Sequence, residues 1–214
     1  STLALDEFAE QFILAAGAKP AFKGYRGYPR TVCTSVNDQV IHGIPSIDIV
    51  LKSGDLLSID VGAVVDGFFG DAAVTVPVGP VAAQAEKLVR VTEEALSRGI
   101  AEARPGNRLY DISAAIQNHV ESSGFSVVRE FVGHGIGRNL HEDPQVPNFG
   151  ERGRGPRIQA GMVLAIEPMV NAGKSKTVVQ DDQWTAVTAD GSLSAHFEHT
   201  IAILEDGPRI LTKR

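Results

Sequence analysis

Apolar residues recur at helical spacing near the start of the chain and predict a helix over residues 2–18. The residues that share one face of this helix are Leu5, Phe8, Phe12, Ile13 and Ala16. Gly17 and Pro20 follow as stop signals. Residues 21–30 are rich in Gly, Tyr and Pro and are expected to be irregular.

Most of the remaining chain alternates between strand-like and helix-like runs. Strands are predicted over 31–36, 56–65, 68–76, 126–132, 162–170, 177–189 and 197–204. Helices are predicted over 80–103 and 109–123, with the first ended by Pro105-Gly106. This order indicates an α+β fold with a largely antiparallel sheet and helices packed on one face. It also suggests two structurally similar halves, although the sequence shows no clear repeat.

Asp66-Gly67 lies between two of these strands and is a strong signal for a two-residue hairpin turn. If both residues form the turn, Asp60 lies opposite Ala73 and Asp71 lies opposite Gly62. The two aspartates are then diagonal neighbours on one face, about 7–8 Å apart. Two like charges this close repel unless a cation or a shared proton lies between them. One aspartate facing solvent while the other caps a turn is the plainer interpretation of this pair alone.

Carboxylates also interrupt two later apolar runs. Glu167 follows Met162–Ile166, and Glu198 precedes Thr200–Leu204. Charged side chains are seldom buried in strands without a partner. Four such interruptions therefore favour a site for divalent cations, in which two ions about 3.5–4 Å apart are bridged by carboxylates and water. Hydrolysis of an amide or a phosphate ester is the reaction class that follows.

Three histidines lie in glycine- or proline-rich contexts: His42, His134 and His141. Each alone is more often a packed or surface residue than a ligand. The glycines around His134 do not match the dinucleotide-binding fingerprint, and the His141-Glu142 pair lacks the second histidine of a zincin helix. Cys33 is the single cysteine, which excludes an all-thiolate zinc site and favours a buried structural thiol.

Composition narrows the class of protein further. The chain has 214 residues, 43% of them hydrophobic, with 20 Lys+Arg against 26 Asp+Glu and a formal charge of −6. This composition is typical of a globular chain, and we expect a single domain over residues 1–214. The acidic balance argues against nucleic acid as the main ligand. The chain contains no apolar run long enough for a membrane span and no signal-peptide pattern at its start.

Seven motifs in order resemble the type I methionine aminopeptidases, which have the pita-bread fold. They are Gly27-Tyr28-Pro29, Ser35-Val36-Asn37-Asp38 with His42-Gly43-Ile44-Pro45, Asp60 with Asp71, Gly133-His134-Gly135-Ile136-Gly137-Arg138, His141-Glu142-Asp143-Pro144-Gln145-Val146, Ile166-Glu167-Pro168-Met169-Val170-Asn171-Ala172-Gly173 and Phe197-Glu198-His199-Thr200. The resemblance extends almost from end to end. It implies pseudo-twofold halves and an antiparallel sheet with helices on its outer face.

The resemblance also implies a set of functional residues. The five ligands of a dinuclear metal centre match Asp60, Asp71, His134, Glu167 and Glu198, with Asp71 and Glu198 as the bridging pair. Glu167 matches the residue that exchanges protons with the attacking water. His141 matches a residue that contacts the scissile carbonyl, and His42 one that hydrogen-bonds near the substrate backbone. The pocket for the methionine side chain matches Tyr25, Tyr28, Cys33 and Trp184.

Cofactors and partners follow from the same resemblance. It implies two divalent ions (Co, Mn, Fe or Zn) and a monovalent cation bound by carbonyls around Asn37, Gln39 and Ser194. The substrate is the N-terminal methionine of nascent peptides, with the ribosome near its exit tunnel as a further partner. A cytoplasmic monomer is expected, with no nucleic acid substrate and no membrane contact.

The chain departs from the family pattern in four places. Members usually begin with a further segment that contains a helix, and this chain starts after it. Leu140 stands where bacterial members often have Phe, His196 where Gln is common, and Phe22 where a small residue is usual. We expect these three changes to reshape the substrate pocket.

The resemblance therefore predicts a metal-dependent methionyl aminopeptidase that prefers a small second residue and in which a metal-activated water attacks the scissile carbonyl. A prolidase or aminopeptidase P relative on the same fold is the nearest alternative enzyme. A catalytically inactive pita-bread module that binds peptides is the alternative from another class. Such modules typically lose metal ligands, whereas all five matching residues are present here.

Overall fold

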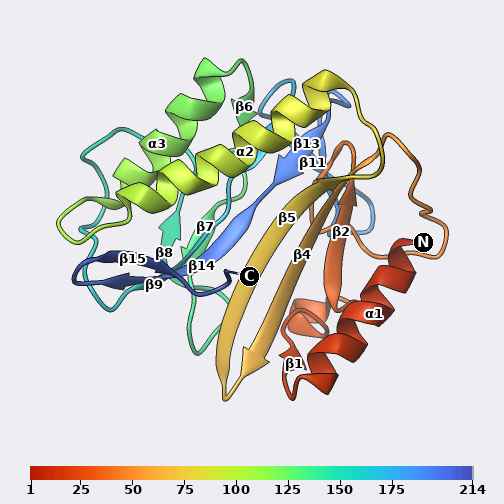
Figure 1. The fold of residues 1–214 in the computed structure, drawn as a ribbon, viewed down its shortest axis with the longest axis horizontal. Coiled ribbons are helices and arrows are strands. Elements are labelled where there is room, and N and C mark those ends of the chain that lie inside the picture. Colours follow the sequence, from red (N-terminus) through yellow and green to blue (C-terminus); the bar gives the residue numbers. More distant parts are fainter. Residues whose placement is uncertain (214) are drawn as a thin grey trace.

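An antiparallel sheet of nine strands forms the centre of the computed structural model, which describes residues 1–213 (Figure 1). Seven strands follow one another across the sheet: β1 (Lys19–Pro20), β4 (Leu56–Val65), β5 (Phe68–Pro77), β14 (Glu198–Leu204), β9 (Val163–Ile166), β7 (Gly133–Gly135) and β8 (Glu142–Val146). β2 (Val32–Val36) pairs with β4, and β15 (Gly207–Ile210) pairs with β14. The predicted antiparallel α+β architecture is confirmed.

The hairpin register predicted from the sequence is confirmed. Asp60 lies opposite Ala73, and Gly62 lies opposite Asp71. The turn residues Asp66 and Gly67 have φ values of 52° and 77°, which is the left-handed backbone that this hairpin turn requires. The register fixes both aspartates on one face of the sheet.

Two small sheets complete the strand structure. One contains β13 (Ser194–His196), β10 (Met169–Asn171) and β6 (Ser126–Val127), and the other contains β11 (Thr177–Val179), β12 (Ala186–Thr188) and β3 (Gln39–Ile41). Three predicted strands are therefore wrong in extent. The strand predicted over 162–170 is two strands in different sheets, separated at Glu167-Pro168, because Pro168 has no N–H to continue the ladder. The strand predicted over 177–189 is a hairpin, and the one over 126–132 ends at Val127.

Helices α2 (Ala83–Glu102) and α3 (Leu109–Ser122) pack beside each other over the outer face of the sheet (Figure 1). Their apolar residues follow the expected helical spacing and belong to the largest core cluster of the described chain. Fully buried side chains at the centre of that cluster are Leu88, Ile112, Ile116, Leu164 and Ile201. This layer supports β9 and β14 from behind.

Helix α1 (Thr2–Ala15) presents a different face to the sheet from the one predicted. Phe8 and Phe12 are 69% and 67% exposed, whereas Thr2, Asp6 and Ile13 are buried. Oδ1 of Asp6 accepts hydrogen bonds from the backbone N–H groups of Thr31 and Val32, at 2.8 and 3.0 Å. These bonds turn the Asp6 side of the helix toward the start of β2, so the buried face includes Ile13 of the predicted set but not Phe8 or Phe12.

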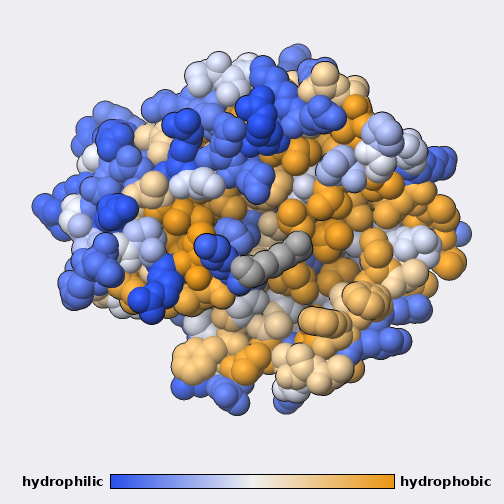
Figure 2. Space-filling model, viewed as in Figure 1, coloured by the Kyte–Doolittle hydropathy of each residue, from blue (hydrophilic) through white to orange (hydrophobic). Residues whose placement is uncertain are grey.

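Apolar residues also gather on the outer surface of the molecule. Figure 2 shows them on the face below α2, over β4 and β5 and beside α1. The exposed apolar side chains include Phe8 and Phe12, whose rings stack with centroids 6.4 Å apart, and Val65 and Phe68 at the hairpin end. Among residues 1–213, no helix is both long enough and apolar enough to cross a membrane.

Candidate metal centre and substrate pocket

Strand pairing places four ligand-type residues on one face of the central sheet. Asp60 of β4 lies opposite Ala73 of β5, and Ala73 lies opposite Glu198 of β14. Residues directly opposite each other on antiparallel strands point to the same side. Asp71 lies two positions from Ala73, and His134 of β7 lies opposite Ala165, which is opposite Thr200 in β14. The period of two along each strand then puts all four side chains on the same side.

These side chains line one cavity of about 150 Å³ on the inner side of the sheet. All of the sequence-predicted metal-binding, catalytic and substrate-binding residues line it. The full lining is Phe22, Tyr25, Arg26, Tyr28, Cys33, His42, Asp60, Asp71, His134, Leu140, His141, Glu167, Trp184 and Glu198. The structure therefore brings together residues that are up to 176 positions apart in the sequence, between Phe22 and Glu198.

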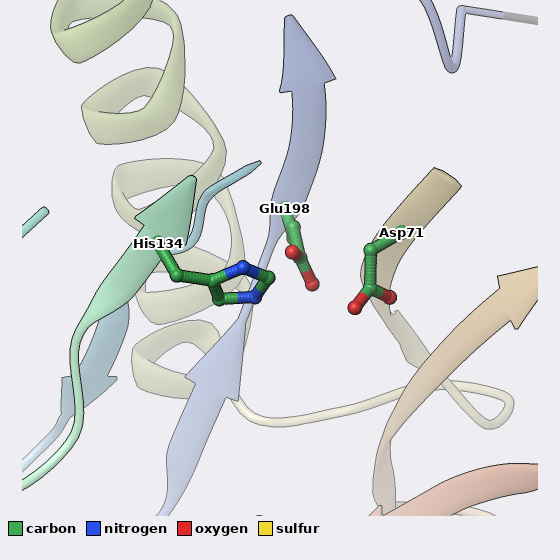
Figure 3. A group of neighbouring side chains, drawn as sticks. All are labelled: Asp71, His134 and Glu198. Atoms are coloured by element: carbon green, nitrogen blue, oxygen red, sulfur yellow. The ribbon is translucent and has the colours of Figure 1, made fainter. Parts of the chain in front are cut away.

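Asp71, His134 and Glu198 point toward one another from three different strands (Figure 3). One ligand atom from each lies within 4.8 Å of the other two. Glu167, His196 and Glu198 form a second group with the same spacing. Nε2 of His134 also lies 3.5 Å from Oε1 of Glu167. Two adjacent groups that share Glu198 are compatible with more than one divalent ion.

His134 is held in the orientation that a metal ligand needs. Its Nδ1 lies 2.8 Å from the carbonyl oxygen of Gly135, which can only accept, so Nδ1 carries the proton and Nε2 presents its lone pair to the carboxylates. Gly135 allows this close packing, because a Cβ at that position would collide with the carbonyl oxygen of Asp143 on β8. The glycines on either side of His134 in β7 therefore allow the close packing that places this imidazole beside β9.

The pKa values of the carboxyl groups at the cavity floor are strongly shifted. Burial, together with repulsion from Asp71, raises the pKa of Asp60, Glu167 and Glu198 well above the ordinary range. Burial also raises the pKa of Asp71 to about 7. Buried oxygens of Asp60, Asp71 and Glu198 have no hydrogen-bond partner. Buried acidic oxygens without partners are costly, and divalent cations would satisfy them, so the donor set fits the metals that the sequence implies.

Two further histidines face the same cavity as neutral imidazoles. Burial lowers the pKa of His42 and of His141 to about 4. His141 stacks on Tyr25 and lies next to His134, with ring centroids 5.4 and 4.3 Å apart. The hydroxyl of Tyr25 lies 2.9 Å from Nδ1 of His141. Both imidazoles can therefore donate or accept hydrogen bonds near the carboxylates without adding charge.

Aromatic residues form the wall of the cavity beside the carboxylates. The hydroxyl of Tyr28 donates to the carbonyls of Val32 and Gly43, at 3.0 and 3.2 Å, so this ring is fixed. The Trp184 ring packs edge-on against Tyr28 with centroids 5.1 Å apart. Cys33 is buried, and burial raises the pKa of its thiol well above the ordinary value. The thiol is therefore a neutral apolar contact here and not a nucleophile.

The three residues that depart from the family pattern, Phe22, Leu140 and His196, lie in different parts of the site. Phe22 and Leu140 line the cavity, as expected of residues that shape a pocket. His196 does not line it; it is buried beside Glu167, with Nε2 3.7 Å from Oε2 of that residue. His196 therefore lies next to a carboxylate of the cavity floor, whereas Phe22 and Leu140 contribute to the lining directly.

Sequence reasoning also missed Arg26, which lines the cavity next to Tyr25. Its backbone is left-handed, with φ 49°, a feature that no sequence pattern indicates for an arginine.

The carbonyl of Asn37, one of the three residues expected around a monovalent cation, accepts a hydrogen bond from the backbone N–H of Ser194 at 2.8 Å. Gln39 lies in the neighbouring strand β3.

Comparison with known proteins gives a consistent result. The model of metallopeptidase family M24 matches residues 1–205. A methionine aminopeptidase of Clostridium perfringens is 59% identical over 99% of this chain and 85% of its own length. The crystal structure of methionine aminopeptidase from Thermotoga maritima has a TM-score of 0.99 and 52% identity, and covers 100% of this chain and 86% of that one.

Prolidase from Pyrococcus horikoshii shares the fold alone, with a TM-score of 0.76 and 24% identity, and this chain covers 54% of its length. The expected pita-bread fold is thus confirmed by the solved structures. The match to methionine aminopeptidases is much closer in identity and in length than the match to the prolidase. The chain therefore belongs to metallopeptidase family M24 and, within that family, to the methionine aminopeptidases.

Proposed function

We infer that this chain is a metal-dependent aminopeptidase that removes the N-terminal methionine from peptides and nascent proteins, with a preference for a small second residue. One observation carries the inference: buried carboxylates and an imidazole form the floor of a cavity whose wall is aromatic and apolar. Such a cavity takes one apolar side chain and places the adjacent peptide bond at the carboxylates. The 214 residues act as one metallo-aminopeptidase domain.

Asp60, Asp71, His134, Glu167 and Glu198 would hold two divalent ions, with Asp71 and Glu198 as the bridging pair. The unpartnered buried oxygens of Asp60, Asp71 and Glu198 support this set. When bound, the ions would supply a water of lowered pKa and an electrophile for the scissile carbonyl. Co, Mn, Fe and Zn all suit carboxylate and imidazole ligands, and a monovalent cation near Asn37, Gln39 and Ser194 completes the proposed cofactors.

Glu167 is the proposed proton carrier. Its carboxylate accepts a proton from the attacking water and returns it to the leaving amine. Burial and the neighbouring Asp71 raise the pKa of Glu167, and a raised carboxyl pKa suits a group that must both take up and release a proton near neutral pH. The 3.5 Å separation from Nε2 of His134 supports a place at the reacting centre.

His141 and His42 are proposed to contact the substrate from opposite sides. His141 would donate a hydrogen bond to the oxygen of the scissile carbonyl, since Tyr25 occupies its Nδ1. His42 lies against Trp184 and Phe131, with ring centroids 6.4 and 5.8 Å away, where it would hydrogen-bond the substrate backbone. Neutral imidazoles suit both roles because they add no charge to the metal site.

The methionine side chain is proposed to enter the slot between Tyr25, Tyr28, Cys33 and Trp184. A flexible, polarizable thioether packs well against aromatic rings and a neutral thiol. The fixed Tyr28 and Trp184 rings give the slot a defined width. Since nascent chains are the substrate class, we propose that the enzyme acts in the cytoplasm as a monomer near the ribosomal exit tunnel.

Peptide turnover tests the proposal directly. The metal-loaded protein should release methionine from Met-Ala-Ser and leave Ala-Pro-Ser intact, measured by mass spectrometry with Mn, Co, Fe and Zn in turn. Turnover of the X-Pro peptide alone would favour a prolidase or aminopeptidase P relative. A protein that binds these metals yet cleaves neither peptide would favour the non-catalytic binding module.

A further inference from the structure

His196 is a buried histidine that the proposed reaction does not use. It ends strand β13, is 1% exposed and lies outside the cavity lining. Its Nε2 has no hydrogen-bond partner within the described chain. Leaving a buried polar nitrogen without a hydrogen-bond partner is unfavourable, so the groups nearest to this nitrogen are candidate partners.

The atom next to that nitrogen is an oxygen of the proposed proton carrier. Oε2 of Glu167 lies 3.7 Å from Nε2 of His196, and Oε1 of Glu167 lies 3.5 Å from Nε2 of His134. The two oxygens of one carboxylate thus face two different imidazoles. Oε1 is thus the oxygen near the predicted ligand His134, and Oε2 is the oxygen near His196.

The backbone of His196 is held on both sides by one threonine. The hydroxyl of Thr75 accepts from the N–H of His196 and donates to its carbonyl, at 2.8 Å in each case. Pairing of Met169 with His196 joins the same residue to β10, which begins two residues after Glu167. The imidazole is therefore fixed relative to the short segment that carries Glu167.

An imidazole can carry its proton on Nε2 and donate it from there. The separation of 3.7 Å is about 0.5 Å longer than the upper end of ordinary N–H···O hydrogen bonds. A rotation of the Glu167 carboxylate toward His196 would shorten this separation. Ligating carboxylates in proteins are commonly hydrogen-bonded in this way.

We propose that His196 is a positioning residue, which donates a hydrogen bond from Nε2 to Oε2 of Glu167 and keeps Oε1 directed at the metal centre. The proposal rests on the proposed function for its catalytic consequence, although its effect on metal binding does not depend on which peptide is cleaved. Glutamine can replace the imidazole in this role because its amide also donates. An aliphatic side chain cannot.

Two substitutions with one matched control test this role. His196→Leu removes the donor, and His196→Gln keeps one. His199→Leu is the control, since His199 is in the adjoining strand β14 and its Nδ1 contacts Thr212 outside the site. We expect His196→Leu to lower both the affinity for Mn, measured by calorimetry, and kcat on Met-Ala-Ser by about 10–100-fold. KM for the peptide should change little. His196→Gln should restore most of the affinity and of kcat, and His199→Leu should match the original protein.

Nitrogen couplings of the bound Mn, measured by pulsed EPR, separate this role from direct ligation. The number of coupled nitrogens should be the same in the original protein and in both His196 variants. Loss of one coupling in both would make His196 a ligand and overturn the proposal. So would a His196→Leu protein with unchanged affinity and kcat. If His196→Leu does not fold, His196→Ala takes its place.

The outcome remains separate from that of the proposed function. An original protein that binds Mn but leaves Met-Ala-Ser intact would refute the proposed function. The affinity difference between His196→Leu and His196→Gln would still decide the positioning role. Equal affinities in those two variants would overturn it.

Discussion

The hydroxyl of Tyr25 lies 2.9 Å from Nδ1 of His141, and the two rings stack with centroids 5.4 Å apart. Burial, with smaller contributions from neighbouring positive groups, keeps the pKa of His141 at about 4, so its ring is neutral near pH 7. When the hydroxyl donates to Nδ1, the proton of the imidazole is at Nε2. Tyr25 thus selects the tautomer that can donate a hydrogen bond to the substrate.

Tyr25→Phe should therefore lower kcat on Met-Ala-Ser by about fivefold, which corresponds to about 1 kcal/mol for one hydrogen bond. KM should change little because the aromatic ring remains in the slot. Steady-state kinetics measure both parameters. Tyr110→Phe on α3 is a control outside the cavity. An equal kcat in Tyr25→Phe would show that this hydroxyl does not set the tautomer.

Glu167→Ala should lose most turnover while folding normally, because the proposed proton carrier is removed but no core contact is. A decrease of about 10²–10⁴-fold in kcat is expected for loss of a general acid–base group. Glu205→Ala, in the exposed turn after β14, should have full activity. Circular dichroism checks the fold, and near-normal turnover of Glu167→Ala would refute the proton-transfer role.

Metal should raise the melting temperature of the protein. Asp60, Asp71, Glu167 and Glu198 supply four of the 26 acidic residues, and they lie in one buried cluster. Repulsion among them destabilises the metal-free fold, and ions that bind only the folded state stabilise it by mass action. Thermal unfolding with Mn or Co, and again after addition of a chelator, measures the effect. An unchanged melting temperature at saturating metal would contradict this electrostatic argument.

The contribution of Asp71 to the stability of the metal-free protein should fall as pH rises from about 4 to about 7, whereas the lowered pKa values of His42 and His141 contribute in the opposite direction. The pKa of Asp71 is about 7 in the folded state and about 3.9 when unfolded. At Asp71 the folded state therefore binds more protons in this range, and this contribution to the free energy of unfolding falls as those protons leave. The raised pKa values of Asp60, Glu167 and Glu198 act in the same direction.

Asp71→Asn isolates this contribution, since an amide stays neutral at every pH. In the presence of a chelator, its melting temperature should exceed that of the original protein by an amount that grows between pH 4 and pH 7 and then levels off. The same variant should lose the stabilisation by Mn. A constant difference across that range would mean that Asp71 does not titrate there.

Asp6→Ala should destabilise the fold without any direct effect on chemistry. Two backbone N–H groups, those of Thr31 and Val32, would lose the carboxylate that accepts their hydrogen bonds. Hydrogen bonds to a charged group contribute about 1.5–3 kcal/mol each, so a loss of about 3–6 kcal/mol is expected for the two. Urea unfolding measures it, with the exposed Asp48→Ala as the control. A loss below about 0.5 kcal/mol, the size usual for a surface substitution, would contradict the anchoring role.

Much of the site could be predicted because its residues are charged, whereas the strand-like runs around them are apolar. Carboxylates inside apolar runs stand out at Asp60, Asp71, Glu167 and Glu198, and the Asp66-Gly67 turn sets the register of the first two. Turn geometry and the period of two along a strand are local properties. Local properties can be read from neighbouring residues, and for that reason the hairpin was predicted residue by residue.

The sequence by itself determined the hairpin, the two long helices and the residue types of a metal centre. Only the tertiary structure decided which face of α1 is buried, because Asp6 bonds to amides that are 25 and 26 residues away. It also decided that the run over 162–170 divides between two sheets at Glu167, and that His196 lies against Glu167 and not in the pocket wall. These outcomes depend on contacts between distant segments, whose energies appear only when the chain is packed.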